Sequence, residues 1–198
     1  MPLRFGIGSR PRLGERSSGD GAWIVERDHE RLVLVVDALG HGAIAAREIE
    51  ALSKLDWANW QGDSCELVQR LHRAMSGGRG AAAMVCLFRQ ETDMWLVDIC
   101  GVGNVRAGLL GEGRVIEGVP GVLGGRLVRS LRAEAIALDT GTPLAIATDG
   151  MSRELWAEKV SPSVDLDELA ASCLRQFGSE RDDATVVLVR AERGLRAR

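Results

Sequence analysis

The residues best suited to chemistry in this sequence are aspartates at the edges of apolar runs. Asp37 and Asp149 each directly follow a strand-like run, and the pair Asp182-Asp183 comes just before another. A carboxylate at a strand end is rigidly held and can point into a shared cleft. Converging carboxylates repel one another strongly unless a cation lies between them. All-oxygen ligand sets suit Mg²⁺ or Mn²⁺ rather than zinc, so this pattern predicts a divalent-metal site.

The elements that must position these aspartates are short strands and amphipathic helices. Apolar runs bounded by polar or glycine-rich breaks predict strands over 3–8, 22–27, 31–37, 81–89, 94–100, 104–110, 143–148 and 184–190, with a further extended segment over 127–138. Apolar stripes at helical spacing predict helices over 42–58 and 65–75 and a short helix over 152–157. Asp165 and Glu168 have the spacing of a capping box that begins a last helix.

The order of these elements indicates the fold class. Strands come in antiparallel-looking runs, and helices come in blocks rather than in strict alternation with strands. This order favours an α+β fold of two packed antiparallel sheets with helices outside, not a doubly wound parallel sheet. The 198 residues contain no repeat or linker, so we expect one domain over 1–198.

Composition excludes several functional classes. The net charge of −3 argues against a general nucleic-acid or anionic-membrane binder. No apolar stretch approaches the roughly 18 residues that span a bilayer, and the N-terminus does not resemble a signal peptide. We therefore expect a cytoplasmic monomer without nucleic-acid or membrane partners. The four cysteines form no CxxC pair and are expected to be buried free thiols.

Five short motifs resemble those of one protein family, and they occur in the family's order. They are Ser18-Gly19-Asp20, Asp37-Ala38-Leu39-Gly40-His41-Gly42, Gly101-Val102-Gly103-Asn104, Ala147-Thr148-Asp149-Gly150 and Asp182-Asp183-Ala184-Thr185. The family is the SpoIIE-type branch of the metal-dependent (PPM) Ser/Thr protein phosphatases. Any one motif alone is weak evidence, but together they extend over nearly the whole chain. The resemblance implies a four-layer αββα sandwich.

The resemblance also implies a centre of two Mn²⁺ or Mg²⁺ ions at one end of that sandwich. Asp37 would bridge the two ions, and the carbonyl oxygen of Ala38 would bind one of them. Asp149 and Asp182 would complete the inner shell, and Asp20 would bind directly or through water. Many relatives have glycine in place of Ala38, but the expected ligand is a backbone oxygen, so this departure changes little.

The implied reaction needs no protein nucleophile. A hydroxide held between the two ions would attack phosphorus in line, with Asp37 and Asp149 as the essential catalytic carboxylates. His41 has two interpretations: a helix-start residue satisfied by backbone, or the acid that protonates the leaving oxygen. Asp183 would adjust the site rather than bind metal.

Three arginines are further candidates, since Arg16, Arg79 and Arg106 could help to hold a phosphate. An arginine is more often a solvated surface charge, and that alternative stays open for each of them.

The resemblance suggests a particular substrate class, namely phosphorylated STAS-domain proteins of a stressosome-like stress-signalling complex. Two alternatives remain. One is a catalytically inactive phosphatase-like binding module, which an intact carboxylate set disfavours. The other is a hydrolase of small phosphate esters, which would share the site but not the substrate.

Overall fold

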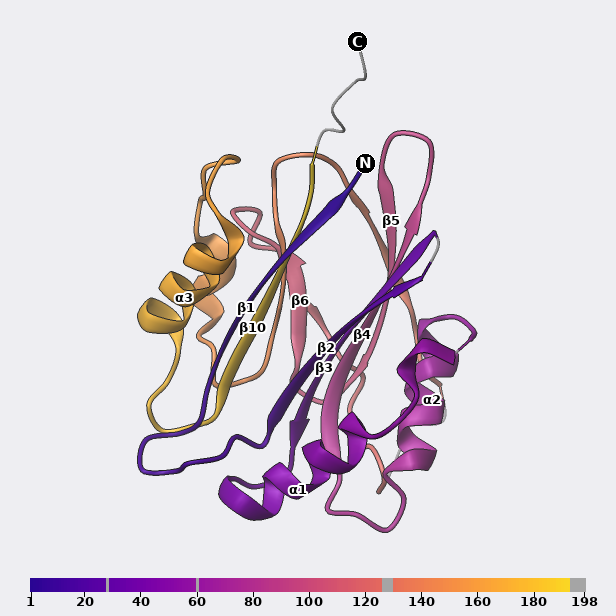
Figure 1. The fold of residues 1–198 in the computed structure, drawn as a ribbon, viewed down its shortest axis with the longest axis vertical. Helices are drawn as coiled ribbons and strands as arrows, with labels where there is room; N and C mark the ends of the chain where they lie inside the picture. Colours follow the sequence, from indigo (N-terminus) through magenta and orange to yellow (C-terminus); the bar gives the residue numbers. More distant parts are fainter. Residues whose placement is uncertain (28, 60, 126–129, 193–198) are drawn as a thin grey trace.

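The computed structural model describes residues 1–27, 29–59, 61–125 and 130–192. Within these ranges the chain forms two five-stranded sheets in which neighbouring strands are antiparallel (Figure 1). The first sheet has the order β1 (Leu3–Arg10), β10 (Ala184–Ala191), β9 (Leu144–Ala147), β6 (Arg106–Leu109) and β7 (Ile116–Glu117). The second has the order β2 (Asp20–Arg27), β3 (Glu30–Ala38), β4 (Ala81–Gln90), β5 (Trp95–Val102) and β8 (Glu134–Leu138).

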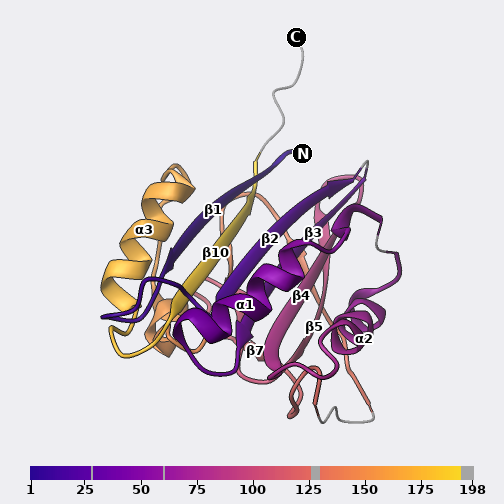
Figure 2. The same cartoon turned by 60° about the horizontal axis from the view of Figure 1, so that its bottom comes forward.

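Helices cover the outer face of each sheet. Helices α1 (Gly42–Ser53) and α2 (Ser64–Ala74) pack on the second sheet, and α3 (Leu166–Phe177) packs on the first (Figure 2). One buried apolar cluster fills the space between the sheets, with Phe88 and Ile146 among its members, and a further cluster lies under each helical layer. The predicted α+β fold, an αββα sandwich, is confirmed.

Several predicted boundaries need correction. The helix expected over 42–58 ends at Ser53, and a separate 3-10 turn, η1 (Trp57–Asn59), follows it. The short helix expected over 152–157 is the 3-10 helix η2 (Arg153–Ala157). The strand expected over 104–110 is shortened to β6. Of the extended segment expected over 127–138, residues 134–138 form β8, while 127–129 lie outside the described residues.

Helix capping also differs in part from the prediction. At the start of α3 the Asp165 carboxylate accepts hydrogen bonds from the backbone of Asp167 and Glu168, which is a single-sided cap. The reciprocal capping box lies instead at the start of α2, between Asp63 and Glu66. Among the described residues, no helix is long and apolar enough to cross a membrane.

The four cysteines are free thiols, as predicted, although Cys65 is only partly buried. Its sulfur lies 3.1 Å from that of Cys100, which joins α2 to β5 in a contact that sequence spacing does not indicate.

Candidate metal centre and active site

The predicted carboxylates gather at one end of the sandwich, where β3 ends and β10 begins (Figure 1). Asp20 opens β2 and lies directly opposite Asp37 in the antiparallel register, so both side chains are on the same face of the second sheet. Ala82 occupies the next position in this row, on β4, and its small side chain leaves space beside Asp37. Strand pairing alone therefore fixes the spacing of two of the candidate ligands.

The first sheet supplies the other candidates. Asp149 follows β9, and Asp182 and Asp183 precede β10, its hydrogen-bonded neighbour. The backbone of these two motifs is in close contact, because a Cβ atom at Gly150 would lie 2.0 Å from the carbonyl oxygen of Asp183. Only glycine allows this approach, which explains the glycine after Asp149.

The carboxylates are close enough to perturb one another. Burial raises the pKa of Asp37 to about 8, and four neighbouring negative charges add to the effect. Those neighbours are Asp20, Asp149, Asp182 and Asp183. Burial likewise raises the pKa of Asp20 to about 7, against the lowering effect of hydrogen bonds from two threonines, Thr148 and Thr185. Such crowding of acids at a partly buried site suits a bound cation, which would return each carboxylate to its charged form.

The pKa of Asp149 is raised as well. Burial is the largest cause and the charge of Asp182 is the next, whereas Arg106 and a hydrogen bond with Asp37 act in the opposite direction. Asp37 and Asp149, the two residues predicted to be essential for catalysis, are therefore close enough across the two sheets for each to affect the pKa of the other.

The carboxylates do not form a closed coordination shell as they stand. Within the described part of the chain, no three Asp, Glu, His or Cys side chains are arranged as a ready metal cluster. Neutral donors hold two of the acids in place: Thr148 donates to Asp20 at 2.7 Å, and Asn104 donates to Asp149 at 2.6 Å. The donor set is all oxygen and anionic, which fits Mg²⁺ or Mn²⁺ in chemistry.

Asp183 has a structural role that Asp182 does not share. Its two oxygens accept hydrogen bonds from the backbone nitrogens of Arg12 at 2.8 Å and Gly19 at 2.7 Å. It therefore holds the β1–β2 loop, residues 11–19, at both ends. This loop leads directly into Asp20, and the expectation that Asp183 adjusts the site stays a prediction.

The three candidate arginines have different surroundings. Arg106 is buried and lies over the ring of Trp156, and it donates to the carbonyl oxygens of Asn104 and Met151. It therefore supports the backbone around Asn104 and Asp149. Arg79 is exposed, and its Nε donates to the carbonyl oxygen of Leu39, within the Asp37 motif. Arg16 is exposed in the β1–β2 loop.

His41 does not cap its helix with its side chain. It occupies the N-cap position of α1, yet its ring makes no cap hydrogen bond. Nδ1 instead lies 2.9 Å from a carboxylate oxygen of Glu15 in the β1–β2 loop. The sequence interpretation missed Glu15, because it stands 26 residues before His41 and outside every recognised motif.

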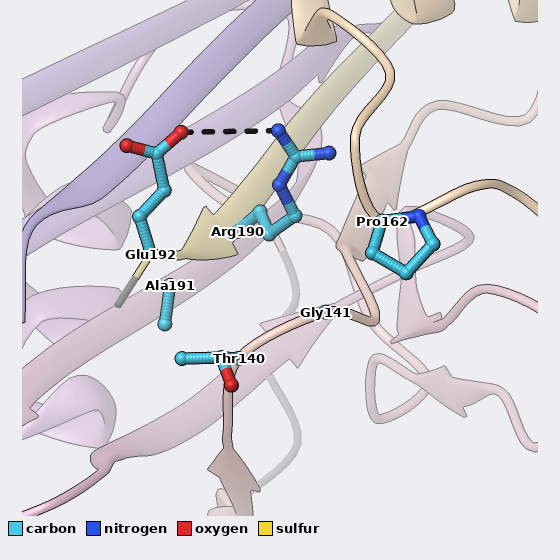
Figure 3. Close-up of a pocket in the computed structure, with 6 residues that line it drawn as sticks. All are labelled: Thr140, Gly141, Pro162, Arg190, Ala191 and Glu192. Carbon is cyan, nitrogen blue, oxygen red and sulfur yellow. Dashed lines mark ion pairs between the residues drawn. The ribbon is translucent and has the colours of Figure 1, made fainter. Parts of the chain in front are cut away.

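A pocket of about 340 Å³ lies at the other end of β10 (Figure 3). Its lining residues are Thr140, Gly141, Pro162, Arg190, Ala191 and Glu192. The Arg190 guanidinium is already engaged there, with the carbonyl oxygen of Val164 at 2.8 Å and with Glu192 at 3.9 Å. An eight-residue strand, roughly 25 Å of chain, separates this pocket from the aspartates, so it takes no part in their chemistry.

Comparison with known proteins gives a consistent result. The chain is 26% identical over 179 residues to the phosphoserine phosphatase RsbX of Bacillus subtilis (strain 168), a match that covers 88% of each chain. No protein-family model matches it.

Solved structures with the same fold include three that match 96% of this chain. The first comes from work on the bacterial stressosome as a modular system that controls secondary messenger signalling; it is 27% identical, with a TM-score of 0.78, and 96% of this chain and 100% of that chain are covered. The second is RsbX in complex with magnesium, at 24% identity and a TM-score of 0.77, with 96% of each chain covered. The third contains the PP2C phosphatase domain of SpoIIE from Bacillus subtilis, at 17% identity and a TM-score of 0.76, covering 96% of this chain and 64% of that one.

The chain therefore has the fold of the PP2C-type phosphatase domains, as the resemblance of its motifs predicted. Its sequence is similar to that of RsbX over most of the length of both chains.

The crowding of carboxylates leads to a prediction about the metal-free protein. Because the pKa of Asp37 is about 8 in the folded protein, the carboxyl stays protonated there while it ionises in the unfolded chain, so stability falls progressively as pH rises from about 4 to 8. Asp37→Asn should remove this cost, with a gain of up to about 5 kcal/mol at pH 8 that vanishes near pH 4. Urea denaturation in EDTA at both pH values measures the difference. Asp93→Asn, in the exposed β4–β5 turn, is the matched control, and a gain of the same size at both pH values would contradict the prediction.

Proposed function

We propose that this protein is a divalent-metal-dependent protein phosphatase that hydrolyses phosphoserine and phosphothreonine. One observation carries the proposal: carboxylates from both sheets converge at one end of the sandwich and raise the pKa of Asp37. Folding brings these acids together against their repulsion, and this arrangement has a clear use if cations bind there. An inactive binding module would have no need of it.

Five residues would hold the metal. Asp37 and Asp149 supply central carboxylates, the carbonyl oxygen of Ala38 a neutral ligand, and Asp182 and Asp20 the remaining acids. When bound, Mn²⁺ or Mg²⁺ would activate water and neutralise the phosphoryl oxygens. Neutral side chains of the protein orient two of these acids. Asn104 keeps Asp149 oriented, and Thr148 does the same for Asp20.

His41 is the candidate acid for the leaving oxygen. Its side chain is 46% exposed, and it stands at the start of α1, four residues after Asp37. A serine or threonine oxygen leaves phosphorus as a strong base unless it takes up a proton as the bond breaks. The ring atom Nε2 is suited to this transfer, since Nδ1 is engaged with Glu15.

We also propose that the substrates are phosphorylated STAS-domain proteins of a stressosome-like complex. The relationship to RsbX and the structural likeness to a stressosome-associated chain support this substrate class. A metal site alone distinguishes one phosphoserine poorly from another, so recognition would fall to the surrounding surface. Leu39 and Ile44 expose apolar side chains on either side of His41, at 44% and 58% exposure.

The first prediction concerns metal dependence. Activity on a phosphoserine protein should require Mn²⁺ or Mg²⁺ and disappear in excess EDTA. Asp37→Asn and Asp149→Asn should each lower turnover by roughly 10²-fold or more while the protein stays folded. Steady-state kinetics and calorimetric Mn²⁺ titration measure the two effects, with Asp93→Asn as the control variant. Full activity in EDTA would reject the metal mechanism.

The second prediction concerns His41. His41→Ala should slow phosphoserine hydrolysis by roughly 10²-fold, but should hardly slow an activated aryl phosphate, whose leaving oxygen needs little proton assistance. Turnover on the two substrates, measured with the same enzyme preparation and Mn²⁺ concentration, tests this. Equal losses on both would indicate a structural role at the start of α1.

The third prediction concerns the substrate. A phosphorylated stressosome STAS protein should be turned over much faster than an unrelated phosphoserine peptide at matched concentration. Ile44→Ser should raise KM for the STAS protein roughly tenfold and leave aryl phosphate hydrolysis unchanged, because it removes only apolar contact area. Met94→Ser, at an exposed apolar position in the β4–β5 turn, is the control. Equal rate constants for the two phosphorylated substrates would reject the STAS proteins as preferred substrates and indicate a phosphatase of low specificity.

A further inference from the structure

The contact between Glu15 and His41 joins two segments that the recognised motifs do not connect. Glu15 belongs to the β1–β2 loop and His41 to the start of α1, and their side chains approach to 2.9 Å between Oε1 and Nδ1. Figure 2 shows this loop beside the N-terminal end of α1. A carboxylate oxygen only accepts, so Nδ1 carries the proton of this hydrogen bond. The contact thereby selects which ring nitrogen is left for a substrate.

The loop that carries Glu15 is held at several points. Asp183 accepts from the backbone of Arg12 and Gly19, and Leu13 donates its backbone N–H to the carbonyl oxygen of Glu180 at 3.0 Å. Glu15 itself donates its backbone N–H to the carbonyl oxygen of Arg12 at 3.0 Å, which closes a turn. Its carboxylate therefore projects from a fixed backbone, as a residue that orients another must do.

The start of α1 is shaped to receive the carboxylate. Gly42 has a φ of +68°, and a Cβ atom there would lie 2.6–2.9 Å from the carboxylate atoms of Glu15. A larger residue would displace the carboxylate from the helix start. An anion at this place is also stabilised by the positive end of the helix dipole. Glycine at position 42 thus makes room for Glu15 as well as for the turn.

We propose that Glu15 is a positioning residue for His41: it accepts the Nδ1 proton and leaves Nε2 directed to the leaving oxygen of the substrate. This inference rests on the proposed phosphatase function. In the step it serves, an oxygen from water bonds to phosphorus as the bond from phosphorus to the serine oxygen breaks. The serine oxygen takes the proton of Nε2, and the proton lost by the water restores the imidazolium through solvent. Glu15 stays ionised and unchanged.

The direct test is the tautomeric state of His41, which does not depend on activity. Two-bond ¹H–¹⁵N spectra of the metal-free protein resolve its three histidines, and His41→Ala identifies the signal. The wild type should show the proton on Nδ1 when the ring is neutral. Glu15→Ala should move the neutral ring toward the Nε2-protonated form, and Glu15→Gln should retain the wild-type pattern, because its amide oxygen can still accept.

Kinetics provide the second arm of the test. Glu15→Ala should lower kcat on a phosphoserine peptide about tenfold with KM little changed, and should leave aryl phosphate hydrolysis nearly intact. Glu15→Gln should recover part of the loss. Glu180→Ala, at an exposed acid on the neighbouring loop, is the matched control.

The outcomes separate the two proposals. An unchanged His41 tautomer in Glu15→Ala overturns the positioning role whatever the activity. Equal losses on both substrates, together with a lowered melting temperature, also overturn it and make Glu15 a structural residue. A wild-type protein that hydrolyses no phosphoester with Mn²⁺ would reject the proposed function, while the tautomer shift would still establish the Glu15–His41 contact.

Discussion

Electrostatic repulsion among the aspartates at one end of the sandwich is the constraint that the rest of the site has to satisfy. Like charges at a partly buried position disfavour ionisation, and this is why the pKa of Asp37 is raised to about 8. The fold withstands this cost because each acid is attached to a different rigid strand end. Asp20 and Asp37 are fixed by the β2–β3 register, and Asp149 and Asp182 flank β9 and β10. The buried cluster between the sheets holds the two pairs at a constant separation.

Neutral hydrogen-bond donors make up the next layer of the arrangement. Thr148 and Asn104 orient Asp20 and Asp149 without adding positive charge that would compete with a metal ion. The nearest buried cation, Arg106, is turned toward backbone carbonyls and the face of Trp156. Its charge still lowers the pKa of Asp149, but burial and the charge of Asp182 outweigh it. The net field at the site therefore remains negative, and it favours a divalent cation over a salt bridge within the protein.

The layers of this fold and the strand-end positions of the candidate carboxylates were predictable from the sequence, because both depend on local patterns. Continuous apolar runs mark strands such as 31–37, and an aspartate at the end of such a run is visible without any tertiary information. Helix ends were less predictable. The apolar stripe of the first helix continues toward Ala58, yet the helix stops at Ser53, where Trp57 turns inward and donates its ring N–H to the carbonyl oxygen of Leu52. The same spacing occurs at Asp63–Glu66 and at Asp165–Glu168, but the reciprocal cap forms at the first pair and not at the second.

The remaining parts of the site depend on contacts between distant segments, which spacing in the sequence does not encode. Asp183 reaches back more than 160 residues to fix the loop before Asp20, and Glu15 reaches His41 from that same loop. Together these contacts connect Asp183 to His41 through the β1–β2 loop. The loop that Asp183 fixes carries Glu15, and Glu15 determines which nitrogen of His41 is presented to a substrate. Asp183, beside the proposed metal site, would thus influence the geometry of the proton donor through its hydrogen bonds to the loop backbone and through the Glu15–His41 contact. On this view the two aspartates of the Asp182-Asp183 pair have different roles. The carboxylate of Asp182 is available to a cation, whereas both oxygens of Asp183 accept hydrogen bonds from the backbone of the loop.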